Sequence, residues 1–181
     1  MGQRQRTSGL SEREREVKQI LERAFPRLRG SGYKLTSKDT PSYNCIAWAA
    51  GDNRRWWWPL NPDGFWPDGV PRTVTMNAFV QAYETVGFVP CRDSRLDRGF
   101  EKIALYADAD GVPKHAARQL PNGKWTSKLG PSVDIEHTLI ALQGQAYGQI
   151  SIFLRRPVDG NVPGTQPSDD SPPDNASSAT P

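Results

Sequence analysis

Three strand-like segments follow one another closely in the middle of the chain, and this spacing constrains the fold more than any other feature. They cover residues 102–107, 114–120 and 124–129. The dipeptide Asn122-Gly123 separates the second from the third, and it favours the tight turn of a β-hairpin. Short connections join antiparallel strands, because a parallel neighbour needs a crossover of a dozen or more residues. The centre of the chain is therefore predicted to be an antiparallel meander.

Helical segments are predicted before and after this meander. Ser11 and Glu14 form the pattern of a capping box, which opens a helix that Pro26 ends. Asp134 is interpreted as the N-cap of the last helix. These patterns together predict an α+β domain over residues 11–156. The expected helices cover residues 11–25, 45–50, 75–86 and 134–142, and shorter strands are expected at 33–36, 88–91 and 147–154.

The two ends of the chain differ in composition from the domain between them. Residues 1–10 are polar, and residues 157–181 consist largely of proline, serine, glycine and aspartate, so both are expected to be disordered. Removing residues 158–181 should leave the melting temperature unchanged, because no large apolar side chain there could anchor the tail. No stretch resembles a membrane span or a secretory signal, which predicts a cytoplasmic protein with no membrane partner.

Charge and cysteine content exclude several classes of function. The formal net charge is +3, which is too mild to indicate a nucleic-acid partner. Two cysteines rule out a disulfide scaffold, although one bridge remains open. Two cysteines and two histidines without metal-ligand spacing predict neither a metal site nor another cofactor.

Cys45 and His115 are the residues with the strongest chemical interpretation. Cys45 begins an apolar helix, where backbone N–H groups favour a thiolate, and His115 lies on the middle strand of the meander. An imidazole near the thiol would make it a nucleophile at neutral pH. We expect the Cys45 sulfur and a ring nitrogen of His115 to lie about 3–5 Å apart. Cys91, after a proline, is interpreted as structural.

A third group should fix the tautomer and orientation of the imidazole. Asp134 is the first candidate, because it follows closely after the strand that pairs with the His115 strand. Ser127, on that neighbouring strand, is the second. Glu136 and His137 are weaker candidates.

Two short runs carry a resemblance to a known superfamily, namely Tyr-Asn-Cys-Ile-Ala-Trp-Ala (43–49) and His-Ala-Ala (115–117), which opens a strand. On these runs the chain resembles papain-like cysteine hydrolases, in particular the NlpC/P60 and CHAP branch. It also resembles a group of uncharacterised bacterial domains that share the pieces Asn-Cys-Ile-Ala-Trp-Ala (44–49), His-Ala-Ala-Arg (115–118) and Trp-Thr-Ser-Lys-Leu-Gly (125–130). The resemblance implies a papain-like fold, in which the cysteine-bearing helix packs on the meander. It also implies a Cys45 nucleophile, a His115 base, and hydrolysis of an amide or peptide bond.

The tryptophan-rich segment 54–71 departs from the usual pattern of that superfamily and has two interpretations. Its aromatic rings could line a groove for an extended substrate, or they could cover a small core. A non-catalytic domain that binds a protein or peptide through this segment is therefore the alternative to a thiol hydrolase. Arg118 and Lys128 are either solvated strand positions or contacts to an acidic substrate. The candidate substrate-binding residues are Asn44, Trp48, Trp57, Trp58 and Trp66.

Overall fold

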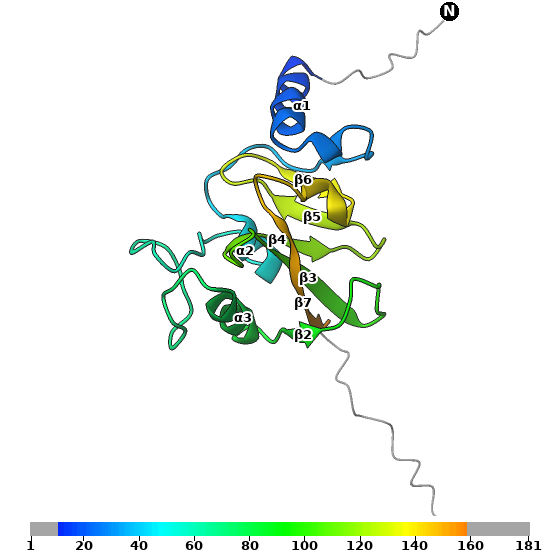
Figure 1. The fold of residues 1–181 in the computed structure, drawn as a ribbon. Helices are drawn as coiled ribbons and strands as arrows, with labels where there is room; N and C mark the ends of the chain where they lie inside the picture. Colours follow the sequence, from blue (N-terminus) through cyan, green and yellow to red (C-terminus); the bar gives the residue numbers. More distant parts are fainter. Residues whose placement is uncertain (1–10, 159–181) are drawn as a thin grey trace, which may run out of the picture.

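The computed structural model describes residues 11–158, which form one antiparallel sheet with helices on both faces. The sheet has seven strands in the order β1-β6-β5-β4-β3-β7-β2, and every neighbouring pair runs antiparallel (Figure 1). The strands are β1 (Lys34–Leu35), β2 (Val89–Cys91), β3 (Phe100–Ala107), β4 (Pro113–Gln119), β5 (Trp125–Lys128), β6 (Asp134–His137) and β7 (Gln149–Pro157). The helices are α1 (Glu12–Ala24), α2 (Cys45–Ala50) and α3 (Met76–Glu84), and the 3-10 helices are η1 (Pro26–Leu28) and η2 (Leu139–Leu142). The α+β class and the central meander β3-β4-β5 are confirmed.

The helix predicted to begin at Asp134 is wrong. Asp134 is the first residue of β6, where it pairs with Lys128 of β5, and only the 3-10 helix η2 follows. Val133 and Ile135, two residues apart, enter the same hydrophobic cluster, which is the period of a strand. The backbone N–H of Asp134 donates to the Ser37 hydroxyl, 2.8 Å away. Strand pairing therefore overrides the local preference of aspartate for a helix cap.

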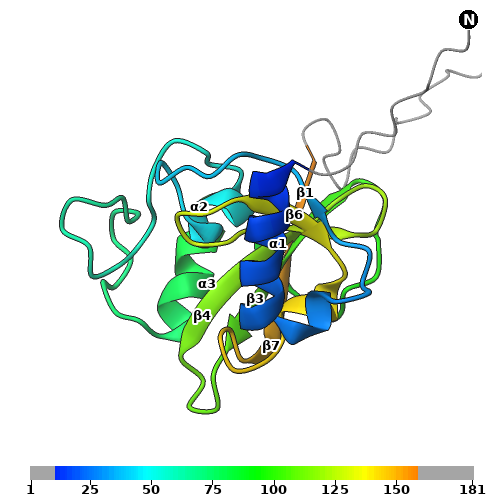
Figure 2. The ribbon, with the colours of Figure 1, turned by 90° about the horizontal axis from the view of Figure 1, so that it is seen from above.

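The central strands are buried on both faces, because alternate side chains enter two different hydrophobic clusters. Ile103 and Leu105 of β3 pack with α2 and α3, whereas Ala104 and Tyr106 pack with α1, η1 and η2. In Figure 1 α1 lies apart from α2 and α3, and Figure 2 shows α1 in front of the sheet. The sheet therefore has an α2–α3 face and an α1 face. Any polar side chain on its central strands must find its partners inside the protein.

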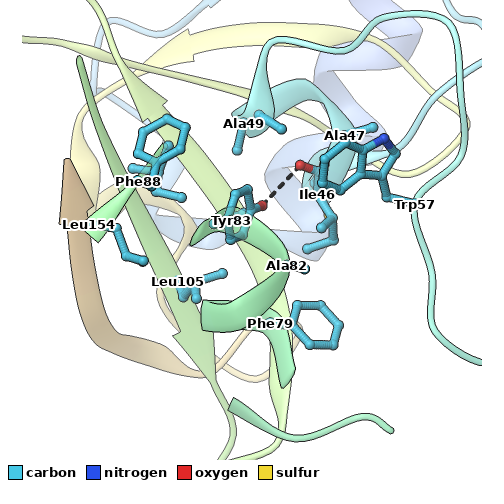
Figure 3. Close-up of a cluster of buried hydrophobic side chains, with 14 of the residues drawn as sticks. Ile46, Ala47, Ala49, Trp57, Phe79, Ala82, Tyr83, Phe88, Leu105 and Leu154 are labelled. Carbon is cyan, nitrogen blue, oxygen red and sulfur yellow. Dashed lines mark hydrogen bonds between the residues drawn. The ribbon is translucent and has the colours of Figure 1, made fainter. Parts of the chain in front are cut away.

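Local signals in the sequence explain where α2 begins and ends. The side chain of Asn44 caps its first turn by accepting from the Ala47 N–H at 3.1 Å. Gly51 ends the helix in the left-handed conformation, with φ of 88°. The Tyr83 hydroxyl of α3 donates to the Ile46 carbonyl at 2.9 Å, which ties the two helices together (Figure 3). These contacts fix the position of Cys45 at the start of α2.

A charged cluster holds the other end of α2 against the sheet. Arg156 of β7 donates to the carbonyl of Ala50 at 3.3 Å and to that of Val86, after α3, at 3.1 Å. Its guanidinium also pairs with Glu101 at 2.7 Å, and Glu101 lies 3.6 Å from Arg118 of β4. Arg118 is thus an internal ion-pair partner in a half-buried setting.

The strand β7 continues to Pro157, one residue beyond the predicted end of the domain. The Val158 N–H donates to the Gly99 carbonyl at 3.0 Å. The predictions for residues 1–10 and 159–181 lie outside the described residues. Among residues 11–158, no helix combines the length and the apolar character needed to cross a membrane.

We expect Tyr83→Phe to lower the free energy of unfolding by about 1–2 kcal/mol, because it removes a fully buried hydrogen bond to α2. Urea unfolding with an unchanged m-value measures this effect. Tyr33→Phe is the matched control, because its hydroxyl bonds the partly exposed Glu22 at 3.1 Å. An equal or larger loss for Tyr33→Phe would contradict the importance of the α2–α3 link.

Candidate active site

Two histidines and one serine form a hydrogen-bonded chain across three neighbouring strands. His115 of β4 lies with its Nε2 2.9 Å from the hydroxyl of Ser127 on β5. The same hydroxyl lies 2.8 Å from Nε2 of His137 on β6. His137 Nδ1 then reaches the carbonyl of Thr138 at 2.8 Å. All three polar side chains are buried, so this His–Ser–His relay is shielded from water.

The end of the relay determines the direction of every proton in it. The Thr138 carbonyl can only accept, so Nδ1 of His137 donates and Nε2 of a neutral His137 accepts. The Ser127 hydroxyl must therefore donate to His137 and accept from Nε2–H of His115. This leaves Nδ1 of His115 with a free lone pair. That nitrogen is buried and has no hydrogen-bond partner in the structure.

Cys45 reaches the same part of β4 from the other face of the sheet. Its side chain belongs to the α2–α3 cluster, together with Ala116. Backbone N–H groups of Ala116, Ile46 and Cys45 itself are directed at the sulfur and stabilise its charged form. The ladder between β4 and β5 pairs only Arg118 with Thr126 and Gln119 with Trp125. The sulfur therefore meets β4 next to His115, before the ladder with β5 begins.

The ionisation of both groups is set by burial. Desolvation raises the pKa of the Cys45 thiol to about 11, and the backbone N–H groups offset only part of this effect. Desolvation also holds the pKa of His115 well below its ordinary value, and the neighbouring His137 lowers it further. The resting pair is a neutral thiol and a neutral imidazole. Within residues 11–158 no hydrogen bond joins Cys45 to His115, and their separation of about 3–5 Å stays a prediction.

Two tyrosine rings enclose the imidazole of His115. Tyr147 stacks on it with 4.0 Å between ring centroids and 4° between planes. Tyr106 of β3 meets it edge-on at 5.4 Å, and the Tyr106 hydroxyl donates to the Leu139 carbonyl at 2.7 Å. Sequence reasoning placed Tyr147 in the last strand, but it lies in the loop before β7. The only signal in the sequence for this contact is that Tyr147 is an aromatic residue just before β7.

Asp134 does not orient the imidazole, so the first choice for the third residue is wrong. Its Oδ2 accepts from the Tyr43 hydroxyl at 2.6 Å, and its Oδ1 is buried without a hydrogen-bond partner. Ser127, the second candidate, holds His115, and His137 supports Ser127. Glu136 instead lies 3.1 Å from Lys124, far from the relay's hydrogen bonds.

Lys128 is neither solvated nor available to a substrate, in contrast to both interpretations of the sequence. Its side chain is fully buried, and its Nζ donates to the Ser132 carbonyl. The ammonium lies over the ring of Tyr43, 5.1 Å from its centroid. Burial lowers the pKa of Lys128, while the nearby Asp134 opposes that shift. Lys128, Asp134 and Tyr43 thus form a second polar cluster just before the start of α2.

Most of the predicted substrate-binding residues are structural. Trp57 and Trp66 are only 1% and 4% exposed and belong to the α2–α3 cluster, so they cover a core rather than line a groove. Asn44 is buried as well, because its amide caps α2 and donates to the Trp57 carbonyl at 2.7 Å. Trp48 and Trp58 are only partly buried against that cluster. These two side chains alone keep a substrate-binding role open.

Cys91 stands apart from the site. It lies on β2 at the edge of the sheet, is partly exposed, and donates to the Asp93 carbonyl at 3.8 Å. Neither Cys91 nor Cys45 forms a disulfide. Within the described range 11–158, no group of histidine, cysteine and acidic side chains could hold a metal ion.

The chain belongs to a family described as "Domain of unknown function (DUF7689)", whose family model matches residues 34–155. The match covers α2 and every strand of the relay, and that description names no activity. Neither a curated protein nor a solved structure matches the chain.

We expect Ser127→Ala to destabilise the protein by roughly 2–4 kcal/mol, because it leaves nitrogens of two buried histidines without partners. Chemical denaturation of the purified variant measures the change. Ser42→Ala is the control, since its exposed hydroxyl only bonds Thr40 and should cost less than about 0.5 kcal/mol. A Ser127→Ala protein as stable as this control would show that the relay is not formed.

Acid should weaken the fold through the relay. Burial lowers the pKa of His137 from 6.5 to about 4, so between these pH values the unfolded chain binds more protons than the folded one. The free energy of unfolding should therefore be fully retained above pH 6.5 and fall as the pH is lowered towards 4. We expect the acid-induced loss of unfolding free energy to be roughly 3 kcal/mol smaller in His137→Gln than in the unchanged protein. Urea titrations across this range test it, and equal losses in both proteins would refute it.

Proposed function

We propose that this member of the DUF7689 family is a thiol hydrolase that cleaves an amide or peptide bond, with Cys45 as nucleophile and His115 as general base. The observation that carries the proposal is the unpartnered Nδ1 of His115. The relay holds Nε2 as the donor and leaves Nδ1 as the basic nitrogen, buried at the residue next to the amide that contacts the sulfur. An unpaired buried nitrogen calls for an explanation, and a base that awaits the proton of the thiol supplies one.

The neutral relay suggests a particular order of proton transfer. A catalytic carboxylate would stabilise an imidazolium, but Ser127 and His137 supply only neutral partners. The thiol therefore keeps its proton until substrate binds, and passes it to Nδ1 of His115 as the sulfur attacks the carbonyl carbon. His115 then gives this proton to the leaving amine. Finally, it takes a proton from the water that attacks the thioester carbonyl, and it returns this proton to the sulfur as the carbon–sulfur bond breaks and the acid product leaves.

The backbone around the sulfur is suited to the intermediate. The N–H groups of Cys45 and Ala116 are both directed at Sγ. A carbonyl oxygen that becomes negatively charged beside the sulfur would meet the same donors, as in an oxyanion hole. The partly exposed Trp48 and Trp58 are the aromatic side chains left to contact a peptide chain nearby.

The resemblance to papain-like enzymes adds to the proposal. A cysteine at the start of a helix, which packs on an antiparallel sheet that carries the histidine, is the arrangement that the resemblance implies. The third position differs, because a serine bridges to a second histidine. The papain-like relationship is thus part of the proposal, together with the hydrolase activity.

A binding domain without catalysis is the second candidate, and the burial of the thiol favours it. Cys45 is 9% exposed and its pKa is raised to about 11, so the resting thiol is a weak nucleophile. The same protein exposes Leu60, at 64%, beside the partly exposed Trp58. These apolar side chains in the tryptophan-rich segment could bind a protein or peptide partner.

Thiol labelling separates the two functions. If the hydrolase proposal is right, iodoacetamide or a dipeptidyl vinyl sulfone should modify Cys45, identified by mass spectrometry, faster than Cys91. His115→Gln should slow the reaction at Cys45 by about 10²-fold or more, because it removes the base. Cys91→Ala is the matched control and should leave the rate at Cys45 unchanged. Cys45 labelling that is slower than Cys91 labelling and independent of His115 would support the binding domain instead.

A further inference from the structure

Tyr147 lies between the buried imidazole of His115 and the solvent. His115 has no exposed surface, whereas Tyr147 is partly exposed. The two rings are parallel and 4.0 Å apart, so the tyrosine covers one whole face of the imidazole. Tyr147 also contacts Phe25, after α1, with ring centroids 4.8 Å apart. A movement of this one side chain would uncover His115.

Two glycines close the base of the loop that carries Tyr147. The N–H of Gly144 donates to the carbonyl of Gly148 at 2.9 Å, and the N–H of Gly148 donates back at 2.7 Å. Both have positive φ, of 144° and 75°, which other residues adopt with strain. Gln145 and Ala146 between them are exposed. The loop is thus a short surface segment with a permissive backbone at each end.

The tyrosine hydroxyl also interacts electrostatically with Cys45 when the thiol is ionised. The pKa of Tyr147 is raised mainly by burial, and a charged Cys45 raises it further. Tyr147 therefore contacts the imidazole with its ring and lies in the electrostatic range of the sulfur. No other described side chain both stacks on His115 and has this coupling to Cys45.

We propose that the Gly144–Gly148 loop is a lid of the Cys45–His115 site, and that Tyr147 is its gate. The proposal rests on the proposed function for what the lid admits, namely the carbonyl group of a peptide or amide. Opening unstacks Tyr147 from His115 and moves the loop on its two glycines. The hydrogen bonds at the base lie within the loop, so the ladder between β3 and β7 stays intact. Closure leaves the thiol and the base dry.

Diethyl pyrocarbonate, which acylates accessible neutral imidazoles, tests the lid in the full chain with Cys45 replaced by alanine. Tyr147→Ala should raise the rate at His115 by at least about tenfold, since a group exposed only by local opening reacts in proportion to the open population. Tyr147→Phe keeps the stacked ring and should leave that rate near its starting value. His137, which is buried at the other end of the relay, is the internal reference and should stay protected.

A second pair of variants moves the backbone and keeps the tyrosine. A Cβ on Gly148 would lie 1.8 Å from the Ala107 carbonyl oxygen, so Gly148→Ala cannot keep the closed loop. A Cβ on Gly130, at a similar φ of 58°, would meet nothing within 4 Å. Gly148→Ala should therefore expose His115 as Tyr147→Ala does, while Gly130→Ala should not.

Two results would overturn the lid. The first is an unchanged rate at His115 in both Tyr147→Ala and Gly148→Ala. The second is an equal rise at His137, which would mean that the whole domain has loosened. This readout needs no thiol, so it is independent of the proposed hydrolase. If the lid variants expose His115 selectively but Cys45 does not react in the labelling experiment, the lid stands and the hydrolase is rejected. If Cys45 reacts but the rate at His115 is unchanged in the lid variants, the hydrolase stands and the lid is rejected.

Discussion

Burial of the central strands on both faces is the constraint from which the site follows. Side chains of β3 and β4 alternate between the α2–α3 cluster and the α1 cluster, so neither face offers water to a polar group. His115, Ser127 and His137 meet this constraint by bonding to one another across β4, β5 and β6. A buried polar group without a partner costs about 1–3 kcal/mol, and among the described atoms of these three side chains only Nδ1 of His115 is left in that state.

The serine between the two histidines decides what chemistry the imidazole can perform. Its single proton can point in only one direction once His137 donates to the Thr138 carbonyl. The free lone pair of His115 is thus fixed by a group two side chains away. A carboxylate in the place of Ser127 would have favoured an imidazolium and a thiolate, and the observed neutral partners favour transfer of the proton during attack. Desolvation favours the neutral form of both groups, because it raises the pKa of Cys45 and lowers the pKa of His115.

The same burial that shapes the relay shields it from solvent, which gives the loop before β7 its importance. If Cys45 and His115 act as the proposed nucleophile and base, part of the structure must move to admit a substrate. Tyr147 is the side chain that combines contact with His115, partial exposure and glycines nearby. The charged contacts of Arg156 and the Tyr83 hydroxyl hold α2 on the opposite side. The structure thus combines a fixed helix α2, which begins at Cys45, with a short glycine-flanked loop over His115.

The sequence by itself determined the elements whose signals are local. The Ser11–Glu14 capping box, the Gly51 stop of α2 and the hairpin at Gly123 depend on neighbours within a few residues, and each forms as expected. The same signals identified Cys45 and His115 as candidates, since a helix start and a central strand are visible in the chain.

Tertiary structure alone decided which distant side chains meet. Asp134 has the local character of a helix cap, but pairing with β5 makes it a strand residue and turns its carboxylate to Tyr43. Ser127 and His137 share one face of the sheet only because of the register between β5 and β6. Whether Trp57 lines a groove or fills a core depends on α3, which packs against it from the far side of the tryptophan-rich segment. The relay, the buried tryptophans and the cover over His115 all arise from contacts between segments far apart in the chain, and such contacts leave no periodic trace in the sequence.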